Sequence, residues 1–227
     1  MVGRVNQQLW SDVDQYFAEA LIAADPALEG ALAASAEAGL PTISVAPNQG
    51  KLLHLLARIQ GARSILEIGT LGGYSTIWLA RALPEDGRLI TLEADPKHAE
   101  VAGRNIAAAG VADRVDLRVG PALDTLPKVD AEGLGPFDFI FIDADKASIP
   151  DYFTWALKLS RPGTVVVIDN VVRGGNVVQA DSQSADVQGI RRLHEQLKTE
   201  PRVDATTLQT VGSKGWDGLT IAVINGG

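Results

Sequence analysis

The chain has 227 residues, of which 46% are hydrophobic and 21% charged, a size and composition that allow one substantial core and favour a single domain. Its formal net charge of −8 and its scattered basic residues argue against a nucleic-acid partner, because a phosphate backbone would be repelled. The absence of cysteine excludes disulfides and thiolate metal sites, and no apolar stretch suits a signal peptide or a membrane span, so we expect a cytoplasmic protein.

The predicted elements change character after residue 60. Before it the sequence predicts only helices: one over residues 9–24, an Ala-rich one ending near Gly39, and one after Pro47 with a broad apolar face. Beyond it, apolar runs alternate with helical patterns, which indicates βαβ units around a parallel sheet. The expected strands are SILEI, RLITLE, RVDLRV, FDFIFID and GTVVVID, with helices from about Ser75, after Pro96, near Pro121 and through Trp155. We therefore expect one domain over residues 1–227, with N-terminal helices (1–60) and an α/β core (61–227).

The last part of the chain breaks this alternation. A helix around residues 187–197 precedes two strand-like runs, VDATTLQTV and GLTIAVI, which are joined through GSKGWD. Strands joined so closely pair as an antiparallel hairpin. The sequence thus predicts a terminal antiparallel hairpin, with Trp216 in its loop.

The segment LEIGTLGGYSTIWLA (residues 66–80) has the strand, glycine turn and helix of a nucleotide-binding unit. A dinucleotide fingerprint needs glycines where this chain has Leu71 and Tyr74, so NAD and FAD are poor candidates, whereas a smaller nucleoside ligand without phosphates is compatible with this turn. Glu93 ends the next strand, where it can accept hydrogen bonds from ribose hydroxyls. Glu67 is a charge inside a buried strand and needs a partner, a role that an amine-bearing ligand would fill. A turn with a purely structural role is the alternative.

In the stretch FDFIFIDADKASIPDYF a nearly continuous apolar run leads directly into Asp143, Asp145 and Lys146. Such a run is typical of a parallel strand buried on both faces, and ligands bind beyond the C-terminal ends of such strands. On this stretch alone, a solvated acidic turn is the alternative.

A second acidic group, Asp169-Asn170, ends the strand that follows. Neighbouring parallel strands lie about 4.8 Å apart, so we expect Asp143, Asp169 and Asn170 to converge. Two carboxylates would repel each other unless a hard cation took oxygen ligands from both, and Mg²⁺ fits three protein oxygens best. Lys146 beside them is either a salt-bridge partner or a general base.

Together LEIGTLGGYS, Glu93, FIDADK and VVIDN, in this order, resemble the metal-dependent S-adenosylmethionine O-methyltransferases of the caffeoyl-CoA and catechol type. The resemblance covers about residues 45–224. It implies a class I methyltransferase α/β fold with a Rossmann-like, seven-stranded sheet whose last strand is antiparallel, helices on both faces and extra N-terminal helices. It also implies a homodimer that methylates one hydroxyl of a catechol-like small molecule or its CoA ester.

The resemblance assigns roles residue by residue. Lys146 would be the base, acting with Asp143 and Asn170, and Asp143, Asp169 and Asn170 would hold Mg²⁺ or another divalent cation such as Mn²⁺ or Ca²⁺. The cosubstrate positions would be Val45, Glu67, Gly69, Thr70, Ser75, Glu93, Ala122, Asp143 and Asp145. Two residues depart from the family pattern: Pro121 stands where an acidic residue is usual, and Arg173 where a bulky apolar residue is usual, which leaves the acceptor open.

Two other functions fit parts of the pattern. A metal-dependent hydrolase could use the same carboxylates, but it leaves Glu67, Glu93 and the glycine turn without a role. A protein that binds S-adenosylmethionine without turnover would not need Lys146 and all three metal positions.

Overall fold

A computed structural model describes residues 2–226, so Met1 and Gly227, the two ends of the predicted domain, lie outside the described residues. In chain order the elements are α1 (Val2–Leu21), α2 (Pro26–Glu37), α3 (Pro47–Gln60), β1 (Ser64–Ile68), α4 (Tyr74–Ala80), β2 (Arg88–Glu93), α5 (Pro96–Ala108), η1 (Ala112–Arg114), β3 (Val115–Val119), α6 (Ala122–Ala131), β4 (Phe137–Ile142), α7 (Ile149–Lys158), β5 (Ser160–Asp169), η2 (Arg173–Val178), α8 (Ala185–Thr199), β6 (Val203–Gly212) and β7 (Gly215–Ile224).

The strands form one sheet of seven in the order β3-β2-β1-β4-β5-β7-β6. Strands β1 to β5 pair in parallel, whereas β7 runs antiparallel to both of its neighbours, β5 and β6. The predicted seven-stranded sheet with a reversed last strand is therefore confirmed. Because β1, β4 and β5 are adjacent and parallel, the residues that follow them meet at one edge of the sheet.

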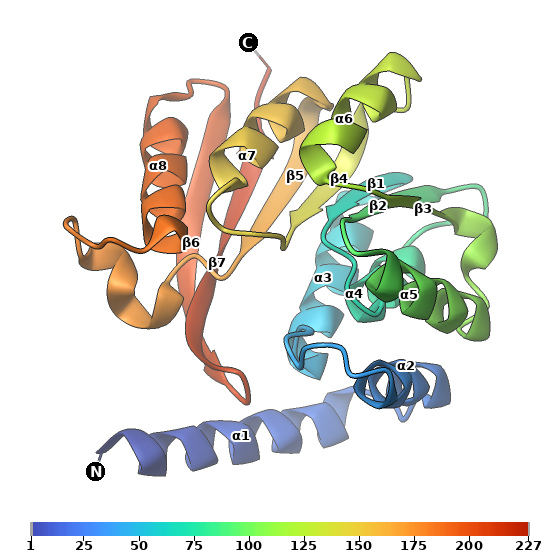
Figure 1. The fold of residues 1–227 in the computed structure, drawn as a ribbon, viewed down its shortest axis with the longest axis vertical. Coiled ribbons are helices and arrows are strands. Elements are labelled where there is room, and N and C mark those ends of the chain that lie inside the picture. Colours follow the sequence, from blue (N-terminus) through green and yellow to red (C-terminus); the bar gives the residue numbers. More distant parts are fainter. Residues whose placement is uncertain (1, 227) are drawn as a thin grey trace.

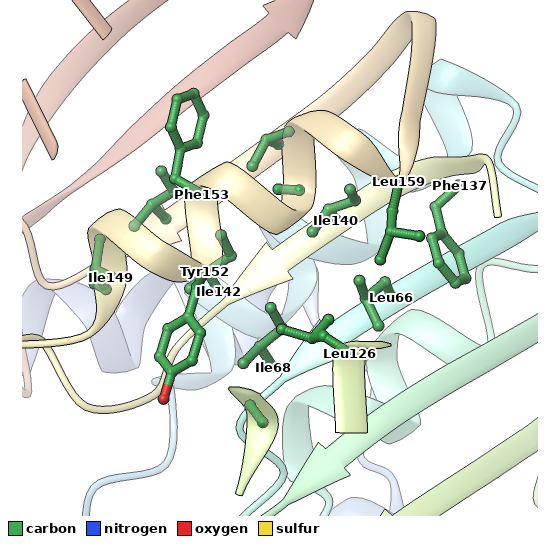
Figure 2. Packing of buried hydrophobic residues seen from close by; sticks show 14 of the residues in the cluster. Leu66, Ile68, Leu126, Phe137, Ile140, Ile142, Ile149, Tyr152, Phe153 and Leu159 are labelled. Atoms are coloured by element: carbon green, nitrogen blue, oxygen red, sulfur yellow. The ribbon is translucent and has the colours of Figure 1, made fainter. Parts of the chain in front are cut away.

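Helices cover both faces of the sheet (Figure 1). One buried cluster combines residues of α6, α7 and α8 with the sheet, and a second combines residues of α3, α4 and α5 with the opposite face. The side chains of β4 divide between them: Ile140 and Ile142 belong to the first cluster, which also contains Ile149 and Tyr152 of α7 (Figure 2), and Phe139 and Phe141 belong to the second. Every residue of β4 is buried, as the continuous apolar run predicts.

The N-terminal helix α1 lies beneath the β6–β7 hairpin in Figure 1. Gln7 donates from its side-chain amide to the carbonyl oxygen of Gly212 at 3.0 Å, and the Ser213 N–H donates to the Asp14 carboxylate at 2.7 Å. These bonds tie the beginning of the described chain to the hairpin near its end. Across residues 2–226, no helix combines the length and apolarity needed to cross a membrane.

The hairpin is tighter than the sequence predicts. The segment GSKGWD is expected as a loop, but β6 continues to Gly212 and β7 begins at Gly215, so only two residues connect the strands. Gly215 adopts a φ of 95°, which glycine tolerates at the end of so short a connection. Trp216 thus lies within β7, paired with Val211, and the prediction that it lies in the loop is wrong.

Two helical glycines should respond in opposite directions to alanine. A Cβ on Gly50 in α3 would lie 2.4 Å from a ring carbon of buried Trp78, whereas a Cβ on Gly103 in α5 meets no atom of the described residues within 4 Å. We expect Gly50→Ala to lower the free energy of unfolding by about 1–3 kcal/mol through overpacking. Gly103→Ala should raise it by about 0.5–1 kcal/mol through the higher helix propensity of alanine. Urea denaturation measures both, and a shift in the same direction would contradict the packing described here.

Candidate active site

A cavity of about 590 Å³ lies at the C-terminal edge of the sheet, where β1, β2, β4 and β5 end. Most of the residues proposed for the site from the sequence line it: Val45, Gly69, Thr70, Ser75, Glu93, Ala122, Asp143, Asp145, Lys146 and Asn170. Two others, Glu67 and Asp169, lie behind the cavity wall, with 0% and 5% of their surface exposed. The structure therefore brings the predicted cosubstrate, metal and base residues together around one cavity.

The glycine turn after β1 passes so close to β4 that no side chain fits between them. A Cβ on Gly69, whose φ is 99°, would lie 2.2 Å from the carbonyl oxygen of Asp143. The next residues are held by Glu93, whose Oε2 accepts the N–H groups of Thr70 at 3.1 Å and Leu71 at 2.7 Å. Leu71 adopts a φ of 51°, an uncommon conformation for a residue with a side chain. These contacts fix the turn against the end of β2.

The second oxygen of Glu93 faces the start of α5. It accepts the N–H of Asp95 at 3.0 Å, and Nδ1 of His98 lies 3.5 Å away. His98 also lines the cavity, a position that sequence reasoning missed. The helix start after Asp95-Pro96 could have revealed it, because a residue in the first turn lies close to the strand end that precedes it.

The buried Glu67 carboxylate has hydroxyl partners within the fold. It accepts hydrogen bonds from Ser75 at 2.6 Å, Thr76 at 2.5 Å and Thr91 at 2.7 Å. Burial nevertheless raises the pKa of Glu67 to about 7, because desolvation of the charge, together with repulsion from Asp143, outweighs these bonds. Through Ser75, which lines the cavity, Glu67 is linked to whatever binds there.

Asp143, Lys146 and Asp169 form the most charged part of the site. Lys146, which is 6% exposed, donates from Nζ to Oδ1 of Asp143 at 2.8 Å. Burial raises the pKa of the Asp169 carboxyl, and the negative charge of Asp143 raises it further. A bound cation would relieve the repulsion that the Asp169 carboxylate meets from Asp143.

Asp169 is held by two donors. Its Oδ1 accepts the N–H of Asn170 at 2.8 Å, and its Oδ2 accepts a hydrogen bond from the side-chain amide of Gln49 at 2.6 Å. Asn170 adopts a φ of 57°, a left-handed conformation that asparagine tolerates better than most residues. Sequence reasoning missed Gln49, because it lies in α3, 120 positions before its partner, and no local pattern links the two.

The donors available for a cation are oxygens. Residues 2–226 contain no cluster of three or more His, Cys, Asp or Glu side chains that could hold a metal, so the amide of Asn170 would have to be the third donor beside Asp143 and Asp169. Carboxylate and amide oxygens suit a hard divalent cation.

The rim of the cavity is formed by Arg173 and Asp186, whose side chains are paired at 2.8 Å. Trp216 packs instead against Gly175, where an added Cβ would lie 2.7 Å from its ring, and its indole N–H donates to Gln209 at 3.1 Å. The Arg173–Asp186 ion pair joins η2 to the start of α8, so Arg173 forms part of the cavity wall, as Asn170 does.

Comparison with known proteins decides the family. The O-methyltransferase family model matches residues 21–223. A catechol O-methyltransferase from Niastella koreensis is 54% identical over 97% of this chain and 100% of the relative. The crystal structure of the O-methyltransferase from Bacillus cereus in complex with SAH superposes with a TM-score of 0.96, at 58% identity, over 96% of this chain and 100% of that one. TomG from Streptomyces achromogenes, in complex with SAM, gives a TM-score of 0.94 at 57% identity over 97% and 99% of the two chains. The chain belongs to the O-methyltransferase family.

This membership confirms several predictions made from the sequence. The fold of this O-methyltransferase is the class I methyltransferase fold, and the protein is an S-adenosylmethionine-dependent enzyme that methylates oxygen. The antiparallel pairing of β6 with β7 is the part of the fold that the sequence predicted from the terminal hairpin. A transferase gives Glu93 and the glycine turn a role, which a hydrolase does not.

The raised pKa of Glu67 predicts how the stability of the unliganded O-methyltransferase depends on pH. A carboxyl whose pKa rises from 4.5 to about 7 on folding stabilises the fold fully below pH 4.5, and this contribution is lost as the pH rises through about 7. Glu67→Gln removes the titration. The difference in unfolding free energy, wild type minus variant, should therefore fall between these pH values, by on the order of 3 kcal/mol. Urea denaturation at several pH values measures it, and a constant difference would contradict the raised pKa.

Proposed function

We propose that this O-methyltransferase uses Mg²⁺ and transfers the methyl group of S-adenosylmethionine to one hydroxyl of a vicinal dihydroxy-aromatic small molecule, a catechol or its CoA ester. The observation that carries the proposal is the convergence of Asp143, Lys146, Asp169 and Asn170 beside the glycine turn at one cavity. The name of the Niastella koreensis relative supports a catechol as acceptor.

We assign the end of the cavity near β1 and β2 to the cosubstrate. Gly69, Thr70 and Ser75 present a turn and a hydroxyl to the space in which the methionine part would lie, and Val45 lines the same space. Glu93 already accepts three backbone N–H groups, so about one lone-pair site, on Oε1, would be left to accept from a ribose hydroxyl. Ala122, at the start of α6, would lie along the adenine, and Asp145 is held by Tyr152 at 2.5 Å.

We assign Asp143, Asp169 and Asn170 to the cation, with Mn²⁺ or Ca²⁺ as substitutes. When bound there, a divalent cation supplies a charge that orients the acceptor hydroxyls and lowers the pKa of one of them. This role fits the structure because the donors are hard oxygens and because the Asp143–Asp169 pair carries negative charge that the single ammonium group of Lys146 balances only in part.

Lys146 is the group that we propose handles the proton. Its Nζ lies in the cavity, 2.8 Å from Asp143, and Asp143 orients it. In this role Nζ accepts or positions the proton of the acceptor hydroxyl, so that the oxygen can attack the methyl carbon in line with the sulfur. The surrounding backbone supplies positioning, which is a large part of catalysis in a displacement of this kind.

We further propose that residues 1–227 form one domain, that the protein is cytoplasmic and that it does not act on nucleic acid. The hydrogen bonds from α1 to the β6–β7 hairpin and from α3 to Asp169 support the single domain, because they join the N-terminal helices to the core. The net charge of −8 supports the exclusion of nucleic acid.

Removal of the cation and substitution of the proposed base, Lys146, should impair catalysis in different ways. EDTA and Asp169→Ala should each abolish methylation of a catechol without weakening the binding of S-adenosylmethionine, as measured by calorimetry, and added Mg²⁺ should reverse the EDTA effect. Lys146→Ala should lower kcat by about 10²–10⁴, the usual contribution of a general base, with partial recovery at high pH where the acceptor ionises unaided. Full activity in EDTA would refute the requirement for a cation. An unchanged kcat for Lys146→Ala would refute the role of Lys146 as a base and leave the cation requirement untouched.

The exposed apolar residues of the N-terminal helices and of β6 support a homodimer. Tyr16 and Leu21 on α1, Ile59 on α3 and Leu208 on β6 are 67%, 71%, 82% and 52% exposed, and α1 contacts both α3 and β6. Large apolar surfaces of this kind mark interaction sites. Light scattering at micromolar concentration should give the mass of a dimer, and Leu21→Asp should shift it toward the monomer. The matched change Val178→Asp, at a residue 79% exposed in η2, should not, and a monomeric wild type would overturn the proposal.

A further inference from the structure

Gln49 of α3 contacts Asp169, one of the residues that we assign to the cation. Its side-chain amide donates to Oδ2 of Asp169 at 2.6 Å, while Oδ1 accepts the N–H of Asn170 at 2.8 Å. Each oxygen of this buried carboxylate therefore has one donor within the protein. Neither donor comes from a part of the chain that binds the cosubstrate in the proposed function.

The fold holds Gln49 in place. It lies in the first turn of α3, after Pro47 at the start of the helix. The next residue, Gly50, lets the helix lie against the ring of Trp78, and buried Leu53 fixes the following turn in the core. Because α3 is packed in this way, the backbone of Gln49 has a fixed position relative to Asp169, which lies at the end of β5.

The hydrogen bond fixes the orientation of the Asp169 carboxylate. One oxygen is held by the Gln49 amide of α3 and the other by the backbone N–H of Asn170, so the plane of the group is set from two sides. Lone pairs of both oxygens remain free, and groups that orient a metal-binding side chain from behind affect metal affinity strongly.

We propose that Gln49 is a positioning residue for the divalent cation: it holds the Asp169 carboxylate in the orientation that the cation requires and does not itself touch cation, cosubstrate or acceptor. This inference rests on the proposed function, which supplies the cation. Through Gln49, a helix of the N-terminal segment would help to orient a metal-binding residue at the end of β5.

The test is Mn²⁺ affinity without any substrate, measured from the loss of the free Mn²⁺ electron paramagnetic resonance signal. Gln49→Met keeps the length of the side chain but removes the N–H, and Gln49→Asn keeps the amide but loses reach. Both should raise the Mn²⁺ dissociation constant about 10- to 100-fold. Binding of S-adenosylmethionine, measured by calorimetry without metal, should stay unchanged, and excess Mg²⁺ should restore most of kcat.

Gln60→Ala is the matched control. Gln60 lies on the same helix and donates to the same strand, to the carbonyl oxygen of Gly163 at 3.0 Å, but at the end of β5 remote from the cavity. The Mn²⁺ affinity of Gln60→Ala should equal that of the wild type. An effect as large as that of Gln49→Met would assign the loss of Mn²⁺ affinity to altered docking of α3 and overturn the inference. Equal affinity in wild type and both Gln49 variants would overturn it while leaving the cation centre standing. If the wild type binds no Mn²⁺, the proposed cation site is refuted, and the inference about Gln49 is refuted with it.

Discussion

The space between the end of β1 and the end of β4 admits no side chain, and the site depends on that constraint. Because a Cβ on Gly69 would meet the Asp143 carbonyl at 2.2 Å, only glycine lets the turn pass there. The turn then lies within reach of Glu93 on one side, and Asp143 lies beside Lys146 on the other. A larger residue would separate the part of the cavity assigned to the cosubstrate from the part assigned to the chemistry.

Four carboxylates at the site are held by different sets of partners. Hydroxyls hold Glu67, backbone N–H groups hold Glu93, an ammonium holds Asp143, and a side-chain amide together with one backbone N–H holds Asp169. The partner sets how much charge remains: an ammonium cancels one, whereas hydroxyls and amides only stabilise it. Lys146 supplies one positive charge beside the two carboxylates of Asp143 and Asp169, so negative charge is left where these two adjoin, and this is the place at which we propose the cation.

The sequence predicted those features that depend on neighbours along the chain. The apolar run of β4, the glycine turn and the helix start after Asp95 each follow from local patterns, and the structure has them where expected. The tight β6–β7 turn was not predicted, since glycine, serine and aspartate in GSKGWD favour a loop and only pairing with the opposite strand overrides them. The contacts of Gln49 and the hydroxyl partners of Glu67 could not be predicted either, because they join residues whose distance in space only the folded chain defines.

The place of β7 in the sheet determines the order in which the sheet can be completed. β7 is the last of the described strands, yet it lies between β5 and β6, so β5 lacks one of its two neighbours and β6 lacks its only neighbour until residues 215–224 arrive. During synthesis β5 therefore remains an open edge of the parallel sheet, with its apolar residues and unpaired peptide groups uncovered. Asp169, which pairs with Leu219, lies at the end of this edge. The ribosome must release almost the whole chain before this carboxylate is enclosed, so a nascent chain halted in the hairpin would carry the glycine turn and Lys146 but no closed site.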